Sequence, residues 1–197
     1  MKTSSSSLFV LLFVWALIAV IAGSVHLLAI VPPGMTSLVI GGLIASLIVV
    51  FTRVPALVDA IAEFSVRQIV AVHVTRFAGL YFLWLHTQGR LPAEFAFRAG
   101  WGDVAAAVGA LMFLIWPSAL RVGWLFVLWN ILGALDLVVA VGTASWLNLT
   151  RPGSMIEMAG LPLTLVPLFF VPLLLTSHVL LLRQPLSEKW GRASARV

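Results

Sequence analysis

Long apolar stretches separated by short polar segments dominate the pattern of this 197-residue chain. About 20 consecutive apolar residues are enough for a helix to cross the hydrocarbon core of a bilayer, which is about 30 Å thick. The pattern therefore predicts an all-α integral membrane protein with six transmembrane helices in a single transmembrane domain, 1–197. The predicted spans cover about 8–31, 35–52, 69–87, 102–116, 120–141 and 161–182.

The segment before the third predicted span has a different pattern. Asp59, Glu63 and Arg67 recur at four-residue spacing among apolar positions. Residues four apart share one face of a helix, and Pro55 suits a first helical turn. These features predict a short amphipathic helix at the membrane interface, either separate from the third span or continuous with it.

Composition agrees with a membrane protein and excludes several other classes. Hydrophobic residues make up 61% of the chain and charged residues only 10%, against about 25% charged residues in a soluble domain. The absence of cysteine excludes disulfides, thiolate nucleophiles and zinc–thiolate sites. The net charge of +5 does not indicate nucleic acid, because the basic residues lie at the ends of apolar runs. The lipid bilayer is the expected partner, and a homo-oligomer or a membrane-complex partner stays open.

The distribution of lysine and arginine predicts the orientation. Six spans place both termini on one side, which carries Lys2, Arg53, Arg67, Arg121, Arg183, Lys189, Arg192 and Arg196. The opposite side carries Arg90, Arg98 and Arg151. Because cytoplasmic loops are enriched in basic residues, both termini are expected in the cytoplasm.

Polar side chains within the predicted spans are the candidate functional residues. A charged residue at the centre of a span costs about 3 kcal/mol on insertion scales and commonly marks a site. Arg76 stays charged and needs an anionic or strongly accepting neighbour; Asp136 is the first candidate and Asp103 the second. The candidate ligand or ion-pair site comprises Arg76, Asp136, Asp103, Asn130, His178 and His73. An ion pair that only fixes helix packing is the alternative interpretation.

The four histidines raise the question of haem or metal. His73/His178 and His26/His86 have matching predicted depths, as two b-type haems would require. However, thirteen residues separate His73 from His86, and at 100° per residue the two rings point about 140° apart. His26 and His86 are weak metal candidates, since no HxxH, HxxxH or ExxH pair supports them. Haem b and a metal ion stay open as cofactors.

The sixth predicted span contains Pro162, Pro167 and Pro172 ahead of His178. Proline removes a helical hydrogen bond, so this span is expected to be kinked or interrupted. Interrupted helices line cavities in many transporters, although plain structural kinks are also common.

The stretches "RFAGLYFL", "LPAEFAFRAGWGD", "WNILGALDLVVAV" and "PLTLVPLFFVPLLLTSH" resemble a group of uncharacterised bacterial multi-pass inner-membrane proteins. The resemblance implies a location in the bacterial inner membrane and no particular activity. Three functions stay open. The first is a polar intramembrane site that binds or translocates a small solute or proton. The others are a structural or assembly subunit and a haem- or metal-binding redox protein. Whether the chain is an enzyme is not predicted.

Overall fold

The computed structural model describes residues 5–183, in which every regular element is a helix. In chain order these are α1 (Ser5–Ser24), α2 (Leu27–Ile30), α3 (Pro33–Arg53), α4 (Pro55–Ala62), α5 (Val66–Val72), η1 (His73–Ala78), α6 (Gly79–Thr87), α7 (Ala93–Ile115), η2 (Pro117–Arg121), α8 (Gly123–Thr150), η3 (Ile156–Ala159), η4 (Val166–Phe170) and α9 (Val171–Arg183).

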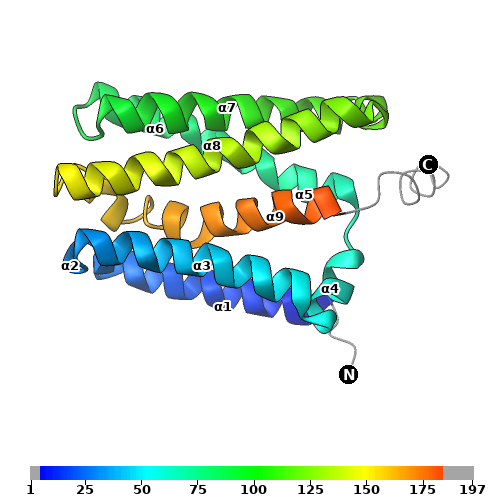
Figure 1. The fold of residues 1–197 in the computed structure, drawn as a ribbon, viewed down its shortest axis with the longest axis horizontal. Coiled ribbons are helices and arrows are strands. Elements are labelled where there is room, and N and C mark those ends of the chain that lie inside the picture. The colour runs from blue at the N-terminus through cyan, green and yellow to red at the C-terminus, as the bar shows by residue number, and fades with distance from the viewer. Residues whose placement is uncertain (1–4, 184–197) are drawn as a thin grey trace.

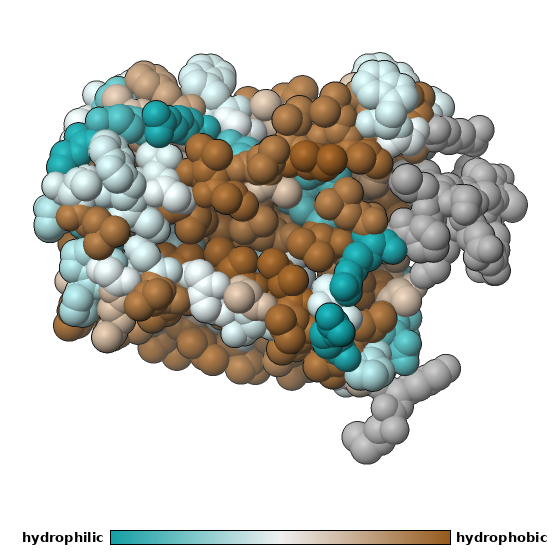
Figure 2. All heavy atoms as spheres, in the orientation of Figure 1, coloured by the Kyte–Doolittle hydropathy of each residue, from teal (hydrophilic) through white to brown (hydrophobic). Residues whose placement is uncertain are grey.

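Six helical segments within the described residues are long and apolar enough to cross a membrane. They are Ser6–Ser24, Pro33–Arg53, Val66–Thr87, Ala93–Ile115, Gly123–Thr150 and Val166–Arg183. The beginning of α1 and the end of α9 lie at one end of the bundle, which we call the terminal end (Figure 1). The α6–α7 connection and η3 lie at the other, the loop end. Apolar side chains dominate the middle of the face in Figure 2, as expected of a membrane protein.

The first predicted span is shorter than expected, because the helix breaks near His26. Gly23 and Ser24 end α1, and His26 adopts a left-handed conformation with φ of 51°. The Ser24 hydroxyl donates to the Ile21 carbonyl at 2.8 Å, which competes with helical bonding at this point. α2 then forms a separate turn.

The fourth and fifth spans are longer than predicted. α7 begins at Ala93, directly after Pro92, rather than at 102. The polar residues of this first part stay on the exposed face, whereas Phe95 and Ala99 are buried. α8 continues to Thr150 rather than 141, because Thr143 and Leu147 still pack into the bundle.

Two interruptions shape the sixth and third spans, and the sixth span begins later than the predicted residue 161. The sixth span begins as a π-helix at Val166, and 161–164 form turns instead of helix. α4 is separate from the third span, because Ser65 starts a new helix. Its hydroxyl accepts from the Gln68 backbone N–H while the Gln68 side chain accepts from the Ser65 N–H, a capping box.

A 3₁₀ segment, η1, interrupts the third span between α5 and α6. Thr75 donates from Oγ1 to the Val72 carbonyl at 2.7 Å, one of the local bonds that accompany this tighter winding. Because residues three apart are eclipsed in a 3₁₀ helix, His73, Arg76 and Gly79 all face the bundle interior and are buried. The 3₁₀ winding therefore brings the side chains of His73 and Arg76 to the same region of the bundle interior.

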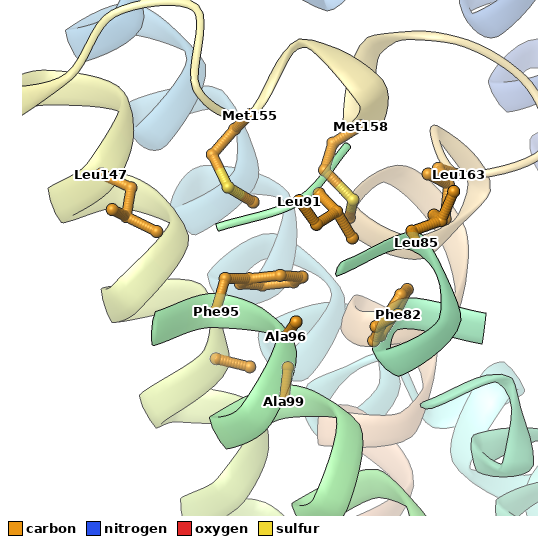
Figure 3. Close-up of a cluster of buried hydrophobic side chains, with 11 residues drawn as sticks. Phe82, Leu85, Leu91, Phe95, Ala96, Ala99, Leu147, Met155, Met158 and Leu163 are labelled. Atoms are coloured by element: carbon orange, nitrogen blue, oxygen red, sulfur yellow. The ribbon is translucent and has the colours of Figure 1, made fainter. Parts of the chain in front are cut away.

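Apolar clusters lie on both sides of the region that holds His73 and Arg76. Towards the loop end, Met155 and Met158 reach down onto a cluster that includes Leu91, Phe95 and Phe82 (Figure 3). Towards the terminal end, a second cluster is built from Val70, Ala110, Phe113, Leu120, Phe126, Trp129 and Leu181. The polar residues of the third, fourth and fifth spans lie between these clusters, enclosed by apolar side chains above and below.

Candidate functional site

Arg76 lies at the centre of a buried polar cluster, with its side chain 1% exposed. Its Nε donates to Asp103 Oδ1 of α7 at 2.7 Å, and its Nη2 donates to Asp136 Oδ2 of α8. Its Nη1 donates to the Gly133 carbonyl at 3.0 Å. The planar guanidinium is well suited to such divergent bonds, since its donors have a fixed geometry. We call the following residues the Arg76 cluster: Arg76, Asp103, Asn130, Asp136 and His178.

His178 of α9 joins the cluster as a neutral ring. Arg76 Nη1 lies 3.4 Å from His178 Nε2, and because a guanidinium only donates, Nε2 presents a lone pair to it. The proton is therefore on Nδ1, which donates to Asn130 Oδ1 at 2.5 Å. Asn130 Nδ2 in turn donates to the His178 carbonyl at 3.0 Å. This reciprocal pair fixes both the ring orientation and its tautomer.

His73 forms a second buried pair with Ser177. The Ser177 hydroxyl donates to the Leu174 carbonyl at 2.7 Å, so His73 Nε2–H donates to Ser177 Oγ at 2.9 Å. His73 Nδ1 then carries a lone pair, and it is the buried side-chain atom that finds no hydrogen-bond partner within the described residues. The rings of His73 and His178 are in contact, with centroids 4.3 Å apart.

Two glycines allow the close approach that the cluster requires. A Cβ on Gly133 would lie 2.7 Å from His178 Cε1 and 3.2 Å from Arg76 Nη1. A Cβ on Gly102 would lie 1.6 Å from Asp136 Oδ1. All three distances are shorter than ordinary van der Waals contact, so any side chain at either position displaces a member of the cluster.

The structure brings together the six residues of the predicted ligand or ion-pair site, with Asp136 and Asp103 both paired to Arg76 rather than as alternatives. It separates them from His26 and His86. His86 Nδ1 lies 3.0 Å from the Leu91 carbonyl, and the His26 ring lies beside Gly160. Asp103 and Asp136 therefore lie with Arg76 at the centre of the bundle, apart from His26 and His86.

The geometry does not favour the haem and metal alternatives. The contacting rings of His73 and His178 leave no space for a haem plane between them. Among residues 5–183, no three histidine, aspartate or glutamate side chains converge in a way that could hold a metal ion.

Two cavities meet at the Arg76 cluster. The larger, of about 280 Å³, lies between α3 and α8 and reaches from Asn148 near the loop end to Asp103; we call it the α3–α8 cavity. The second, of about 180 Å³, is bordered by Arg76 and Asp103 on one side and by 162–174 on the other. Asp103 lies in the wall that both cavities share.

A third cavity, of about 180 Å³, lies in the half of the bundle near the terminal end. α1, α3, α5 and α9 supply its apolar walls, and Ser177 borders it; we call it the α1–α9 cavity. Because Ser177 holds His73, this cavity approaches the polar centre from the opposite side to the α3–α8 cavity.

Sequence reasoning missed Ser177 as a partner of His73, and it missed the Gly133 carbonyl as an acceptor for Arg76. One signal was available for Gly133. Asn130, Gly133 and Asp136 follow one another at three-residue spacing, which places them near one face of α8. No comparable signal connects Ser177 with His73, because they are 104 residues apart.

An all-helical membrane protein with a buried arginine–carboxylate cluster is the class that these elements define. Residues 33–185 match the model of a family described as "Domain of unknown function (DUF8737)", and the chain belongs to that family. The match runs from α3 to α9 and includes every residue of the Arg76 cluster. No curated protein and no solved structure matches the chain.

Proposed function

We propose that the chain is a multi-pass protein of the bacterial inner membrane, with both termini in the cytoplasm, whose Arg76 cluster binds or translocates a proton or a small solute. One observation carries this proposal. A single guanidinium faces two carboxylates in a buried place that borders a cavity.

The charge balance favours a proton as the bound species. With both carboxyl groups ionised and the two imidazoles neutral, Arg76, Asp103 and Asp136 sum to one net negative charge. An uncompensated charge in an apolar interior costs several kcal/mol. One proton on Asp103 or Asp136 removes that cost, so the cluster is suited to take up a proton and to release it when another positive charge arrives.

The placement of the cavities supports translocation. The α3–α8 cavity is lined by the beginning of α3 and ends at Asp103. The α1–α9 cavity is lined by the end of α3 and ends at Ser177. Arg76, His178 and His73 lie between the two. A polar centre approached by separate cavities from opposite ends is the arrangement expected of a site with alternating access.

Infrared difference spectroscopy of the purified protein between low and high pH tests the proton site. A protonated buried carboxyl group gives a C=O stretching band that disappears as the pH rises. Asp103→Asn and Asp136→Asn each leave one cation facing one anion, so both variants are expected to lose this band. Asp59→Asn, which removes an exposed carboxylate on α4, is the matched control and should retain it. A wild type without a titrating band, or a band that persists in both cluster variants, contradicts the proposal.

A structural role is the second candidate, because Arg76 joins η1 to both α7 and α8. If packing is its only role, Asp103→Asn and Asp136→Asn lower thermal stability, and no carboxyl group titrates in the wild type. A structural or assembly subunit also co-purifies with a larger membrane complex. The presence or absence of the titrating carboxyl band, together with the co-purification result, distinguishes a proton or solute site from a structural role.

A further inference from the structure

Asp103 lines the α3–α8 cavity and has one carboxylate oxygen without a hydrogen bond within the described residues. The residue is 9% exposed, and its Oδ1 is held by Arg76 Nε. Its Oδ2 accepts no hydrogen bond from any group in the described part of the chain, while the residue lines the cavity wall. A carboxylate oxygen that is largely shielded from bulk solvent and receives no donor from the protein favours a donor in the cavity, which gains a strong, charge-assisted bond there.

The rest of the cavity wall is uncharged and mostly apolar. Asp103 is the charged residue in its lining, which contains no arginine, lysine or histidine within the described residues. Phe82 and Phe95 contribute aromatic rings to the wall, and Ala140 and Ala144 leave open space along α8. The hydroxyl and amide groups of Ser145 and Asn148 lie nearer the loop end. Such a wall accepts an apolar body and rejects an anion.

We propose that the α3–α8 cavity binds an apolar organic cation, an amine whose ammonium group pairs with Asp103 Oδ2. This inference rests on the proposed function, because the ammonium takes the place of the proton. Its positive charge brings the sum over Arg76, Asp103 and Asp136 to zero. The volume of about 280 Å³ lies near the lower limit of about 300 Å³ for small-molecule pockets. The ligand is therefore a small amine with a compact apolar group.

None of the other described groups around Asp103 supplies a further positive charge, so a cation is the ligand charge that complements the site. Arg76 of η1 is shared with Asp136 of α8, and His178 of α9 offers Arg76 only a lone pair. His73, also on η1, donates to Ser177 and lies beyond His178. From α3, the cavity receives Thr36, Ser37 and apolar side chains, none of them charged.

Three probes of similar shape and different charge test the proposal: 2-phenylethylamine, 2-phenylethanol and 3-phenylpropionate. Saturation-transfer NMR on the purified full chain is expected to show binding of the amine, with weaker or no binding of the alcohol and the carboxylate. Asp103→Asn should weaken amine binding about tenfold or more, the loss expected for a charge-assisted bond. Equal binding of amine and alcohol, or unchanged binding in Asp103→Asn, overturns the inference.

Two further measurements keep the test independent of variant stability. Ala144→Phe fills the cavity without touching the Arg76 cluster and should abolish amine binding, whereas Ala105→Phe on the exposed face of α7 should not. In the wild type, the amine should move the loss of the carboxyl band to lower pH, because the ammonium binds the ionised carboxylate. If the carboxyl band titrates but the amine does not change the pH at which it is lost, this inference is overturned and the proposed function stays intact. A missing band contradicts both.

Discussion

At the scale of the residue, Arg76 differs from the exposed arginines in the burial of its side chain and in the number of its carboxylate partners. Arg90 pairs with Glu157, and Arg151 pairs with Glu94, with both arginine side chains 46% exposed. Such exposed pairs contribute about 0–1 kcal/mol each. Arg76 is buried and faces two carboxylates. Removing one partner from a buried pair costs about 3–5 kcal/mol, because an uncompensated charge is left behind.

Arg76→Leu is expected to destabilise the protein by about 3–5 kcal/mol, since it leaves two carboxylates without a cation. The triple variant with Asp103→Asn and Asp136→Asn should recover much of that loss, because no charge then remains in the cluster. Arg90→Leu, at an exposed pair, should change stability by no more than about 1 kcal/mol. Thermal unfolding of the purified variants in one detergent measures all three. If the triple variant is no more stable than Arg76→Leu, charge imbalance is not the cause.

At the scale of the element, helix period and helix spacing place the polar residues together. The third span could be predicted to exist from its apolar length, but its period could not. The 140° separation of His73 and His86 assumed 100° per residue, and this assumption fails over η1, which turns with three residues per turn. The pairing of Arg76 with Asp136 could be predicted, because a buried cation needs an anionic neighbour. The contacts of Asp103, Gly133 and Ser177 depend on helix rotation, which one sequence does not specify.

Glycine sets the distance between α8 and α9 at the cluster. Gly133→Ala should lower the free energy of unfolding by about 1–3 kcal/mol, the usual cost of overpacking, because its Cβ would lie 2.7 Å from His178 Cε1. Gly142→Ala, on the same helix with nothing within 4 Å of its Cβ, is the matched control. It should be neutral or stabilising by up to about 1 kcal/mol, since alanine favours helix over glycine. Thermal unfolding decides, and equal effects of the two substitutions contradict this account.

At the scale of the whole molecule, the cysteine-free sequence makes the orientation directly testable. If the termini are cytoplasmic, Gln88→Cys and Ser154→Cys at the loop end should react with a membrane-impermeant maleimide in intact spheroplasts. Ser118→Cys, in η2 on the opposite side, should react only after the membrane is opened. The reverse labelling pattern contradicts the orientation predicted from the basic residues.

The helices are held together by two kinds of contact. Hydrogen bonds, which have a fixed direction, connect one part of the bundle, and apolar contacts, which have none, attach the other part. The hydrogen bonds of the Arg76 cluster connect η1, α7, α8 and α9, and each fixes both distance and angle. In the described residues, α1 and α3 contact that part of the bundle through apolar side chains and through one hydrogen bond, from Arg183 to the Thr52 carbonyl. Apolar contacts between packed helices allow small shear movements, because they fix no hydrogen-bond angle. α3, which forms one wall of the α3–α8 cavity, shares no hydrogen bond with the Arg76 cluster in the described residues, so we expect a small shift of α3 to leave the ion pairs of the cluster in place.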